Sequence, residues 1–410
     1  MSPASSSHNL LQRSDVGAVL ALLNRDGEEA RIVGGAVRDS LMGRPVSDID
    51  IATTTLPDTV MQLARAQGWK VVPTGIAHGT VTLVIEGIPI EVTTLRRDVE
   101  TDGRHAVVAF SRDFREDAFR RDFTINALSL SSDGILHDYA TGVADAKAGR
   151  LRFMGDAGLR IREDYLRILR FFRFHASRGR GAPEPEALQA CADLKEGMAG
   201  LSRERIRQEL LKLLVAERAI DAVALMQSIA LWPVIVPGVT LDLSRFGNLA
   251  AIEQRLGKAP DAIVRLAALS ADADWQKLLK LSNHEQVRLD GMRRFVPEFG
   301  TEVASDGLIR SLIFRASGAG FQDALMLAGA SGGHEADWIE SHLEKARPYL
   351  AEPSLNPFSS ADILALGIPP GPRMGEILKQ ATLLWLEAGL PDDTQQQKLL
   401  LAEAVRTTQG

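Results

Sequence analysis

The 410-residue sequence lacks several features that would assign it to particular environments. It has a single cysteine, Cys191, so it can form neither an internal disulfide nor a cysteine-based zinc site. No apolar run approaches the roughly eighteen residues of a transmembrane helix. The opening segment MSPASSSHNLLQRSD has no basic stretch followed by an apolar one, which is the pattern of a secretory signal. We therefore expect a short disordered lead-in and a cytoplasmic protein.

An excess of positive charge is also absent, because the formal net charge is −6 at pH 7. This value argues against a protein that coats nucleic acid without specificity. The charge is nevertheless uneven: nine arginines lie within 150–180, whereas the last sixty residues hold seven acidic and four basic side chains. Clustered cations favour one defined polyanion site, because phosphate groups are neutralised locally. A solvated charged helix is the alternative, and composition alone does not decide between them.

The first 150 residues alternate between strand and helix patterns, which predicts an α/β head with a small mixed sheet. Length alone predicts two to four domains for the whole chain. Strands are expected over 30–33, 48–53, 70–73, 80–85 and 88–94. Helices are expected over 15–24, 36–42 and 57–68. Glu86-Gly87 lies between the last two strands and predicts a hairpin.

Strand patterns nearly vanish after residue 151, and helical periodicity dominates. Helices are expected over 164–177, 202–214, 219–229, 335–347, 360–366 and 373–388. We therefore expect three parts in chain order. A catalytic head over 1–150 precedes a helical neck over 151–215, which is followed by a helical body and tail over 216–410.

Asp48 and Asp50 stand one residue apart in a predicted strand. Alternate side chains of a strand project to the same side, so the two carboxylates would lie together. Adjacent carboxylates repel each other unless a cation lies between them. Mg²⁺ takes one or two carboxylates together with waters and substrate phosphates. The pair therefore indicates a magnesium site, although a solvated turn explains the same spacing when it is taken alone.

Gly34 and Gly35 lie between a predicted strand and a predicted helix. Glycine lets a backbone approach a phosphate closely, and a helix N-terminus favours an anion. Arg38, on the first helical turn, would add a charge-assisted contact. Arg38 precedes Asp48 by ten residues, with a helix stop between them, and this combination is more specific than either motif alone.

Five segments resemble, in order, the motifs of the class II tRNA nucleotidyltransferase and bacterial poly(A) polymerase superfamily. The stretch RIVGGAVRDSLMGRPVSDIDIATT is similar to its first motif, and RRDFTINA, beginning at Arg120, to its ribose-contacting motif. Residues 138–152 resemble its hinge motif, EDYLRILR from Glu163 its base-selecting helix, and ERIRQEL from Glu204 the helix that braces it. The motifs span roughly the first 210 residues, and the rest matches only as a helical body of the expected size.

The resemblance implies roles for individual side chains in nucleotide binding. Arg121 and Asp122 would contact the ribose, and Asp164 and Arg167 would read the base through its hydrogen-bonding edge. Arg170 and Arg173 would contact the triphosphate or the base-reading pair. From the residues alone, Asp164, Arg167, Arg170 and Arg173 form a stripe spaced by three along one helix. The alternative for Asp164 and Arg167 is an ordinary ion pair worth a few tenths of a kcal/mol.

Three further features are weaker. Glu91 follows the hairpin turn and is expected either as a third carboxylate beside the metals or as an edge glutamate without a role. Residues 96–105 are polar and lack an apolar face, which predicts a flexible loop; the resemblance implies that it assists nucleotide switching. His137-Asp138 suggests a metal phosphohydrolase, but the eight histidines form no supporting cluster in the sequence, and we reject that interpretation.

The resemblance implies template-independent transfer of nucleotides to an RNA 3′ end. Asp48 and Asp50 would hold two Mg²⁺ ions while the 3′-hydroxyl attacks the α-phosphorus of the nucleotide. The implied partners are the tRNA 3′ end, CTP and ATP, with no membrane and no stable protein partner.

CCA addition to tRNA is favoured over poly(A) addition by two features. Residues 74–81 resemble the CCA-adding enzymes where poly(A) polymerases usually carry a basic stretch, and the acidic C-terminal residues lack a basic tail. A partial CC-adding enzyme is a further alternative. An RNA-binding protein with an inactive head is the non-enzymatic one, and the intact aspartate pair argues against it.

Overall fold

Two compact units make up the computed structural model, which describes residues 10–102, 105–334, 336–351 and 356–408. The first unit ends at Pro237 and the second begins at Gly238. The expected head and neck, 1–150 and 151–215, fall within the first unit, and this three-part subdivision stays a prediction. The proposed lead-in falls largely on residues 1–9, outside the described residues. No described helix is both long and apolar enough to cross a membrane.

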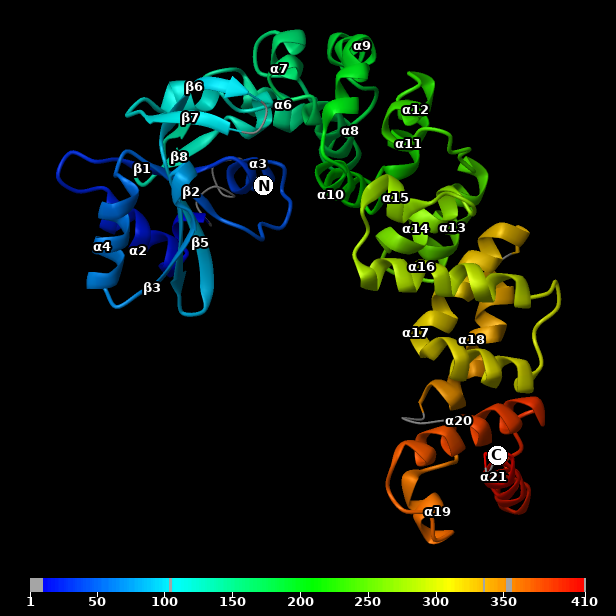
Figure 1. Ribbon diagram of the computed structural model, residues 1–410. Coiled ribbons are helices and arrows are strands. Elements are labelled where there is room, and N and C mark those ends of the chain that lie inside the picture. The colour runs from blue at the N-terminus through cyan, green and yellow to red at the C-terminus, as the bar shows by residue number, and fades with distance from the viewer. Residues whose placement is uncertain (1–9, 103–104, 335, 352–355, 409–410) are drawn as a thin grey trace. The chain divides into compact units, whose positions relative to one another are not determined.

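A mixed sheet lies at the centre of the head (Figure 1). Its strands are β1 (Ala30–Val33), β2 (Asp50–Thr53), β3 (Lys70–Gly75), β4 (Thr80–Ile85), β5 (Ile88–Thr94), β8 (Ser129–Ser131) and β9 (Leu136–His137). Their spatial order is β3-β4-β5-β2-β1-β8-β9. β2 and β5 pair in parallel, whereas the other neighbouring strands pair antiparallel. The hairpin of β4 and β5 is confirmed, and both of its turn residues, Glu86 and Gly87, have positive φ.

Helices cover the sheet and continue beyond it to the end of the first unit. They are α2 (Ser14–Leu23), α3 (Gly35–Leu41), α4 (Pro57–Ala66), α5 (Phe114–Phe119), α6 (Gly142–Ala148), α7 (Ala157–Glu163), α8 (Leu166–Arg178), α9 (Pro185–Leu194), α10 (Arg203–Leu214), α11 (Ala219–Ser228) and α12 (Trp232–Ile235). Short 3₁₀ turns are η1 (Ile76–His78), η2 (Thr124–Asn126) and η3 (Lys195–Gly200). α2 and α4 pack on one face of the sheet, where Val19, Ile51 and Val60 are buried in one apolar cluster.

The second unit is helical throughout its described residues. Its helices are α13 (Leu243–Arg255), α14 (Ala262–Leu269), α15 (Trp275–Leu279), α16 (Asn283–Phe295), α17 (Asp306–Gly332), α18 (Ala336–Leu350), α19 (Ser360–Ala365), α20 (Pro372–Glu387) and α21 (Thr394–Thr407), with a 3₁₀ turn η4 (Val296–Glu298). The predicted end of a helix at Arg347 is wrong, because α18 continues through Pro348 to Leu350. A proline this close to a helix end removes a single intrahelical hydrogen bond. Glu335, the expected first residue, lies outside the described residues.

The predicted flexible loop over 96–105 is wrong. β6 (Arg96–Asp102) and β7 (His105–Phe110) form a two-stranded antiparallel sheet in which Arg96 pairs with Phe110. Residues 103 and 104 lie outside the described residues. The sequence HAVVAF of β7 is apolar and β-branched, which favours a strand. Backbone pairing with β7 is therefore sufficient to make β6 a strand, although the sequence of 96–105 has no apolar face.

Buried ion pairs connect the head to the neck. Asp39 of α3 accepts two hydrogen bonds from its neighbour Arg38, both of 2.8 Å, and two from Arg178 of α8, of 2.7 and 3.0 Å. Burial alone would raise the pKa of Asp39, but the hydrogen bonds from Arg38 and Arg178 outweigh it and lower the pKa. A buried carboxylate shared by two guanidinium groups thus fixes α8 against α3.

We expect Asp39→Asn to lower the free energy of unfolding by about 3 kcal/mol, because it leaves two largely buried guanidinium groups without their anion. Urea unfolding of the full chain, followed by circular dichroism, measures the change. Asp58→Asn is the matched control, since Asp58 is exposed on α4. The control should change stability by less than about 0.5 kcal/mol. Equal effects of the two substitutions would contradict this account of Asp39.

The same contribution should depend on pH. Because the folded-state pKa of Asp39 is lowered, its stabilisation is complete above the ordinary carboxyl pKa of about 4 and is lost as the pH falls through the folded-state value. The difference in stability between the wild type and Asp39→Asn should therefore shrink below about pH 4. A difference that stays constant down to pH 2 would show that the charge of Asp39 does not provide it.

Candidate active site

The predicted metal-binding pair lies at the start of β2, the middle strand of the sheet. The strand begins at Asp50 and not at Asp48 as expected, so Asp48 lies in the segment that leads into it. Both aspartates are exposed and the intervening Ile49 is buried, which is the alternation that the sequence predicts. Ser47 donates a hydrogen bond of 3.0 Å from its hydroxyl to Asp48.

Glu91 joins the two aspartates through the parallel pairing of β2 with β5. Its Cα lies opposite that of Asp50 in the register. Desolvation raises the pKa of Asp50, and the charges of Glu91 and Asp48 raise it further, while Arg121 acts in the opposite direction. In the part of the chain that the structure describes, no three His, Cys, Asp or Glu side chains form a ready-made metal site. A cation here would need further ligands from water or substrate.

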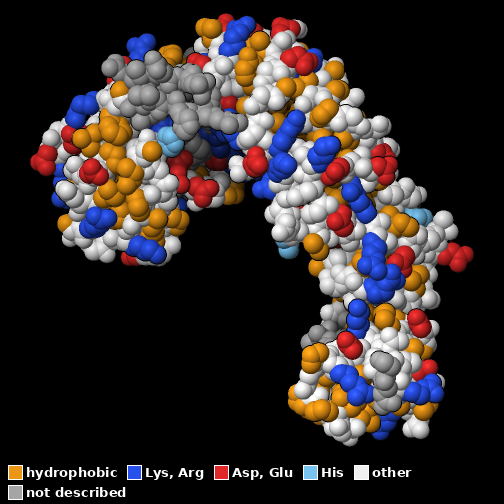
Figure 2. All heavy atoms as spheres, in the orientation of Figure 1, with side chains coloured by type: hydrophobic (Ala, Val, Ile, Leu, Met, Phe, Trp, Pro, Cys, Tyr) orange, Lys and Arg blue, Asp and Glu red, His pale blue; other side chains and the backbone are white. Residues whose placement is uncertain are grey.

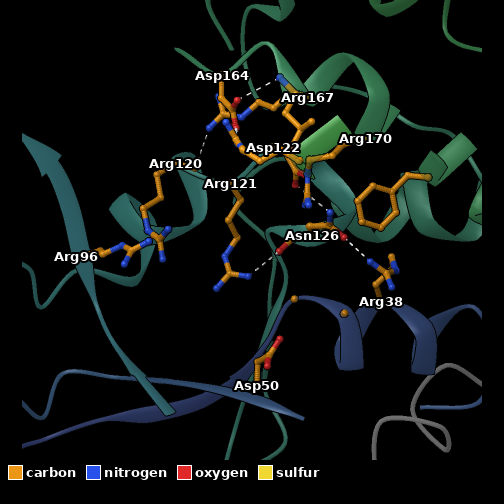
Figure 3. Close-up of a pocket in the computed structure, with 15 residues that line it drawn as sticks. Arg38, Asp50, Arg96, Arg120, Arg121, Asp122, Asn126, Asp164, Arg167 and Arg170 are labelled. Atoms are coloured by element: carbon orange, nitrogen blue, oxygen red, sulfur yellow. Dashed lines mark hydrogen bonds and ion pairs between the residues drawn. The ribbon is translucent and has the colours of Figure 1, made fainter. Parts of the chain in front are cut away.

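A tight backbone turn separates β1 from α3. Gly34 has φ of 69°, which strains any other residue, and a Cβ at this position would lie 2.8 Å from Nη1 of Arg121 and would have to displace that guanidinium group. Arg121 is held in place by Asp117, to which its Nη2 donates over 3.0 Å, and by the carbonyl oxygen of Asn126 at 3.2 Å. In Figure 3 its guanidinium group points into the cavity on the side of Asp50.

A chain of buried hydrogen bonds runs from α3 to α8. Arg38 donates to Oδ1 of Asn126 over 2.5 Å, and Asn126 donates in turn to Oδ1 of Asp122 over 2.9 Å. Oδ2 of Asp122 accepts from Nε of Arg170 at 2.8 Å. Burial would raise the pKa of Asp122, but the charge of Arg170 and these hydrogen bonds lower it. The helix α3, which follows the predicted phosphate-binding turn at Gly34-Gly35 (the phosphate turn), is thus connected to α8 through the predicted ribose motif.

Asp164 does not lie on the helix predicted for it. α7 ends at Glu163 and α8 begins at Leu166, so the helix expected over 164–177 starts two residues later than predicted. Asp164 has extended φ and ψ of −157° and 104°. Its Oδ1 accepts from the backbone nitrogen of Leu166 at 3.1 Å. Aspartate favours such breaks because its side chain satisfies a backbone N–H group two residues ahead.

The side chains of the two predicted base-reading residues bind other partners and not each other, although the backbone nitrogen of Arg167 donates to the carbonyl oxygen of Asp164 over 3.0 Å. Oδ2 of Asp164 accepts from Arg205 of α10 at 2.7 Å. Nη1 of Arg167 donates to Glu163 over 2.6 Å and to the carbonyl oxygen of Arg160 over 2.7 Å. The ion pair that the sequence offered as an alternative is therefore replaced by two separate pairs.

Arg170 and Arg173 differ in their surroundings. Arg170 contacts Asp122 and also Glu209 of α10, and it lines the cavity. Arg173 binds Glu209 and lies 4.0 Å from the ring centroid of Phe174, and it is not among the residues that line the cavity. Arg173 therefore lies outside the described lining and is held by Glu209, and its predicted contact with the triphosphate or the base-reading pair stays a prediction.

These side chains surround a cavity of about 600 Å³ (Figure 3). Seven of the lining residues are arginines and three are aspartates. Asp50 lies at one end, and Asp164 and Arg167 lie at the other (Figure 3). The predicted residues in its lining are Gly34, Gly35, Arg38, Asp50, Arg121, Asp122, Asp164, Arg167 and Arg170. The surplus of positive charge and the length of the cavity suit a nucleoside triphosphate.

The remaining lining residues were given no role by the sequence analysis. They are Arg96, Arg120, Asn126, Leu166, Phe174 and Arg205. Four of these residues lie within the motifs that carry the family resemblance, and this is the only signal in the sequence that could have identified them. They are Arg120, Asn126, Leu166 and Arg205. Asp48 and Glu91 flank Asp50 but do not line the cavity themselves.

Two sequence profiles match the first unit and the start of the second. One, described as "Poly A polymerase head domain", matches residues 30–152. The other, described as "Probable RNA and SrmB- binding site of polymerase A", matches residues 182–243. The first profile covers β1, β2 and the phosphate turn, so it includes the acidic end of the cavity.

Individual proteins extend the similarity to almost the whole chain. A CCA-adding enzyme of Limosilactobacillus fermentum is 32% identical over 92% of this chain and 93% of its own. The mitochondrial CCA tRNA nucleotidyltransferase 1 of Danio rerio is 48% identical over 47% of this chain and 45% of its own. The crystal structure of the Bacillus stearothermophilus CCA-adding enzyme in complex with CTP has a TM-score of 0.73 and 26% identity, over 99% of both chains.

The match to the bacterial sequence spans both units, whereas the chain spans about half the length of the Danio rerio protein. The similarity to the B. stearothermophilus structure confirms the predicted fold class, an α/β head followed by helices. The order of motifs, the cavity that joins them and the near full-length bacterial relative agree. The chain belongs to the family of CCA-adding tRNA nucleotidyltransferases and poly(A) polymerases, on its CCA-adding side.

Proposed function

We propose that this protein adds CCA to the 3′ end of tRNA from CTP and ATP without a nucleic-acid template. The observation on which this depends is one cavity with Asp50 at one end, arginines along its length and Asp164 and Arg167 at the other. A nucleotide bound along it would place its base at the pair and its phosphates near Asp50. The CCA-adding relatives support the same activity.

The carboxylates fit a divalent cation, and we propose Mg²⁺. Asp48 and Asp50 supply hard oxygen ligands, and Glu91 adds negative charge beside them. Their number is too small for a closed protein site, which suits an ion that keeps waters and substrate phosphates as ligands. When bound, such ions activate the 3′-hydroxyl and stabilise the triphosphate and the departing pyrophosphate.

The protein's own groups position the reactants and neutralise charge. Arg38, Arg121 and Arg170 are fixed by buried hydrogen bonds before a nucleotide binds, so little reorganisation is needed when the triphosphate enters. Alignment of the 3′-hydroxyl with the α-phosphorus then permits direct in-line attack, and a covalent intermediate is not required.

Base selection follows from the hydrogen-bonding character of the pair. A carboxylate only accepts hydrogen bonds and a guanidinium group only donates them. Cytosine and adenine both present an exocyclic amine beside a ring acceptor, whereas uracil and guanine present a carbonyl oxygen where the amine would be. Asp164 and Arg167 together therefore suit CTP and ATP.

Poly(A) addition to general RNA is the alternative within the family. The visible face of the second unit shows basic and acidic side chains interspersed, without a continuous basic band that would hold many RNAs (Figure 2). Residues 74–81 form the end of β3, η1 and the start of β4, and they bring one histidine and no arginine or lysine. Both features favour a tRNA substrate.

The cytoplasm is the compartment that we propose, with no stable protein partner. The near full-length relative comes from a bacterium, whereas the Danio rerio relative is named as mitochondrial and aligns over less than half of its length. The single cysteine, Cys191, is buried and free, which suits a reducing compartment.

Asp48→Ala should lower nucleotide incorporation about a thousandfold, because it removes about 4 kcal/mol of charge stabilisation at the reacting phosphate. Binding of tRNA, measured by gel shift, should stay unchanged, since Asp48 lies outside the basic cavity wall. Asp58→Ala, which removes an exposed carboxylate from α4, is the control and should retain wild-type rates. Undiminished turnover by Asp48→Ala would overturn the assignment of this pair.

Removal of divalent ions should have the same effect reversibly. Incorporation of labelled CTP should stop in excess EDTA and return when Mg²⁺ is added in excess of the chelator, because without a cation between them the carboxylates repel the triphosphate. Asp48→Ala should not recover under the same addition. Full activity in the presence of EDTA would show that the site works without a metal.

The product formed on tRNA that lacks its terminal trinucleotide distinguishes the proposed activity from its rivals. We expect CTP and ATP together to extend the tRNA by three nucleotides, as resolved on a sequencing gel. If both nucleotides are supplied and only CTP is incorporated, the protein is a partial CC-adding enzyme. Long incorporation of ATP into unrelated RNA would indicate a poly(A) polymerase, and no incorporation at all would favour the RNA-binding alternative.

A further inference from the structure

The carboxylate of Asp164 is held from two separate elements. Its Oδ1 accepts from the backbone nitrogen of Leu166 at 3.1 Å, and its Oδ2 accepts from Nη2 of Arg205 at 2.7 Å. Arg205 belongs to α10, forty-one residues further along the chain. Each carboxylate oxygen has two acceptor positions, so both oxygens keep one for a ligand. These two contacts fix the plane of the carboxylate at the end of the cavity.

α10 is well placed to hold this contact. Arg205 and Glu209 are four residues apart and therefore lie on the same side of the helix. Glu209 is buried and binds both Arg170 and Arg173 of α8. The position of Arg205 relative to α8 is thus set by a second, buried contact one turn away, so Arg205 reaches Asp164 from a rigid support.

Without Arg205, Asp164 could instead bind Arg167, the other residue of the predicted base-reading pair. Arg167 follows Asp164 by three residues, and in the structure it binds Glu163 and the carbonyl oxygen of Arg160. In a direct ion pair, Asp164 and Arg167 would occupy the hydrogen-bonding groups with which they would otherwise bind a base. Arg205 and Glu163 draw the two side chains to separate partners, which leaves their facing edges available to a base.

We propose that Arg205 is a positioning residue that sets base selectivity by holding Asp164 in place as a hydrogen-bond acceptor. The inference deepens the proposed function and rests on it. With the carboxylate fixed, an amino group of cytosine or adenine finds an acceptor, whereas the carbonyl oxygen of uracil or guanine meets a negative charge. Once released, Asp164 can turn toward Arg167 or solvent, and the penalty against uracil falls.

Arg205→Met tests the proposal, because methionine keeps the length and apolar stem of arginine but donates no hydrogen bond. The ratio of kcat/KM for CTP to that for UTP should fall about tenfold, or about 1.4 kcal/mol, since a fixed hydrogen-bonding pair provides the discrimination. The KM for CTP should rise while kcat changes little, as expected for an interaction made equally in the ground and transition states. A parallel measurement of CTP and UTP binding by equilibrium dialysis needs no RNA.

Two further variants separate positioning from general damage. Arg205→Lys keeps a donor and should retain most of the CTP preference. Lys212→Met removes one positive charge from an exposed position on the same helix and should leave the ratio unchanged. An equal loss of kcat for all nucleotides by Arg205→Met, with the CTP to UTP ratio preserved, would overturn the proposal in favour of a purely structural role.

Failure of the proposed function would look different. If the wild-type protein binds CTP more tightly than UTP but transfers neither to tRNA, the activity is wrong while the role of Arg205 is still decided by dialysis. A preference for CTP that persists in the dialysis of Arg205→Met would refute the inference about Arg205 whatever the outcome of the transfer assay.

Discussion

Seven guanidinium groups share one cavity, and their mutual repulsion has to be offset before any ligand binds. Buried carboxylates provide the offset. Asp117 binds both Arg120 and Arg121, and Asp122 binds Arg170. Burial alone would raise the pKa of these two aspartates, but the arginines keep both pKa values low, so the carboxylates stay charged. The cavity keeps a surplus of arginines over aspartates, and this surplus attracts a polyanion.

Some of these contacts also determine the architecture, because in them the carboxylate and its arginine come from different elements. Asp122 precedes η2 in the head, whereas Arg170 belongs to α8 in the neck. Asp39 on α3 and Arg178 on α8 repeat this arrangement on another side. Neutralising the arginines therefore also fixes the neck helix against the head. The groups predicted to bind phosphate and to read the base are thus aligned by charge balance together with the aromatic contacts of Phe123 with Phe171 and Phe174 of α8.

Local features of the head could be predicted from the sequence because they depend on near neighbours. The bounds of β1, β4 and β5 follow from alternation, and the hairpin follows from Glu86-Gly87. Gly34 could be assigned to a tight turn, since a strand before it and a helix after it leave few alternatives. Nine of the twelve predicted site residues line one cavity, and for these the resemblance supplied the roles that spacing alone left open.

Contacts between distant elements could not be predicted in this way. The periodicity of α8 indicates which residues lie near each other along that helix, but it cannot show that Arg173 faces Glu209 and not the cavity. Acidic Asp164 precedes basic Arg170 and Arg173 along the chain. On α10 the order of charges is reversed, because basic Arg205 precedes acidic Glu209, so that each charge binds an opposite one. Either helix alone looks like an ordinary charged surface. The complementarity exists only in the register in which α8 and α10 pack, and that register decides that Arg170 lines the cavity while Arg173 lies outside its lining.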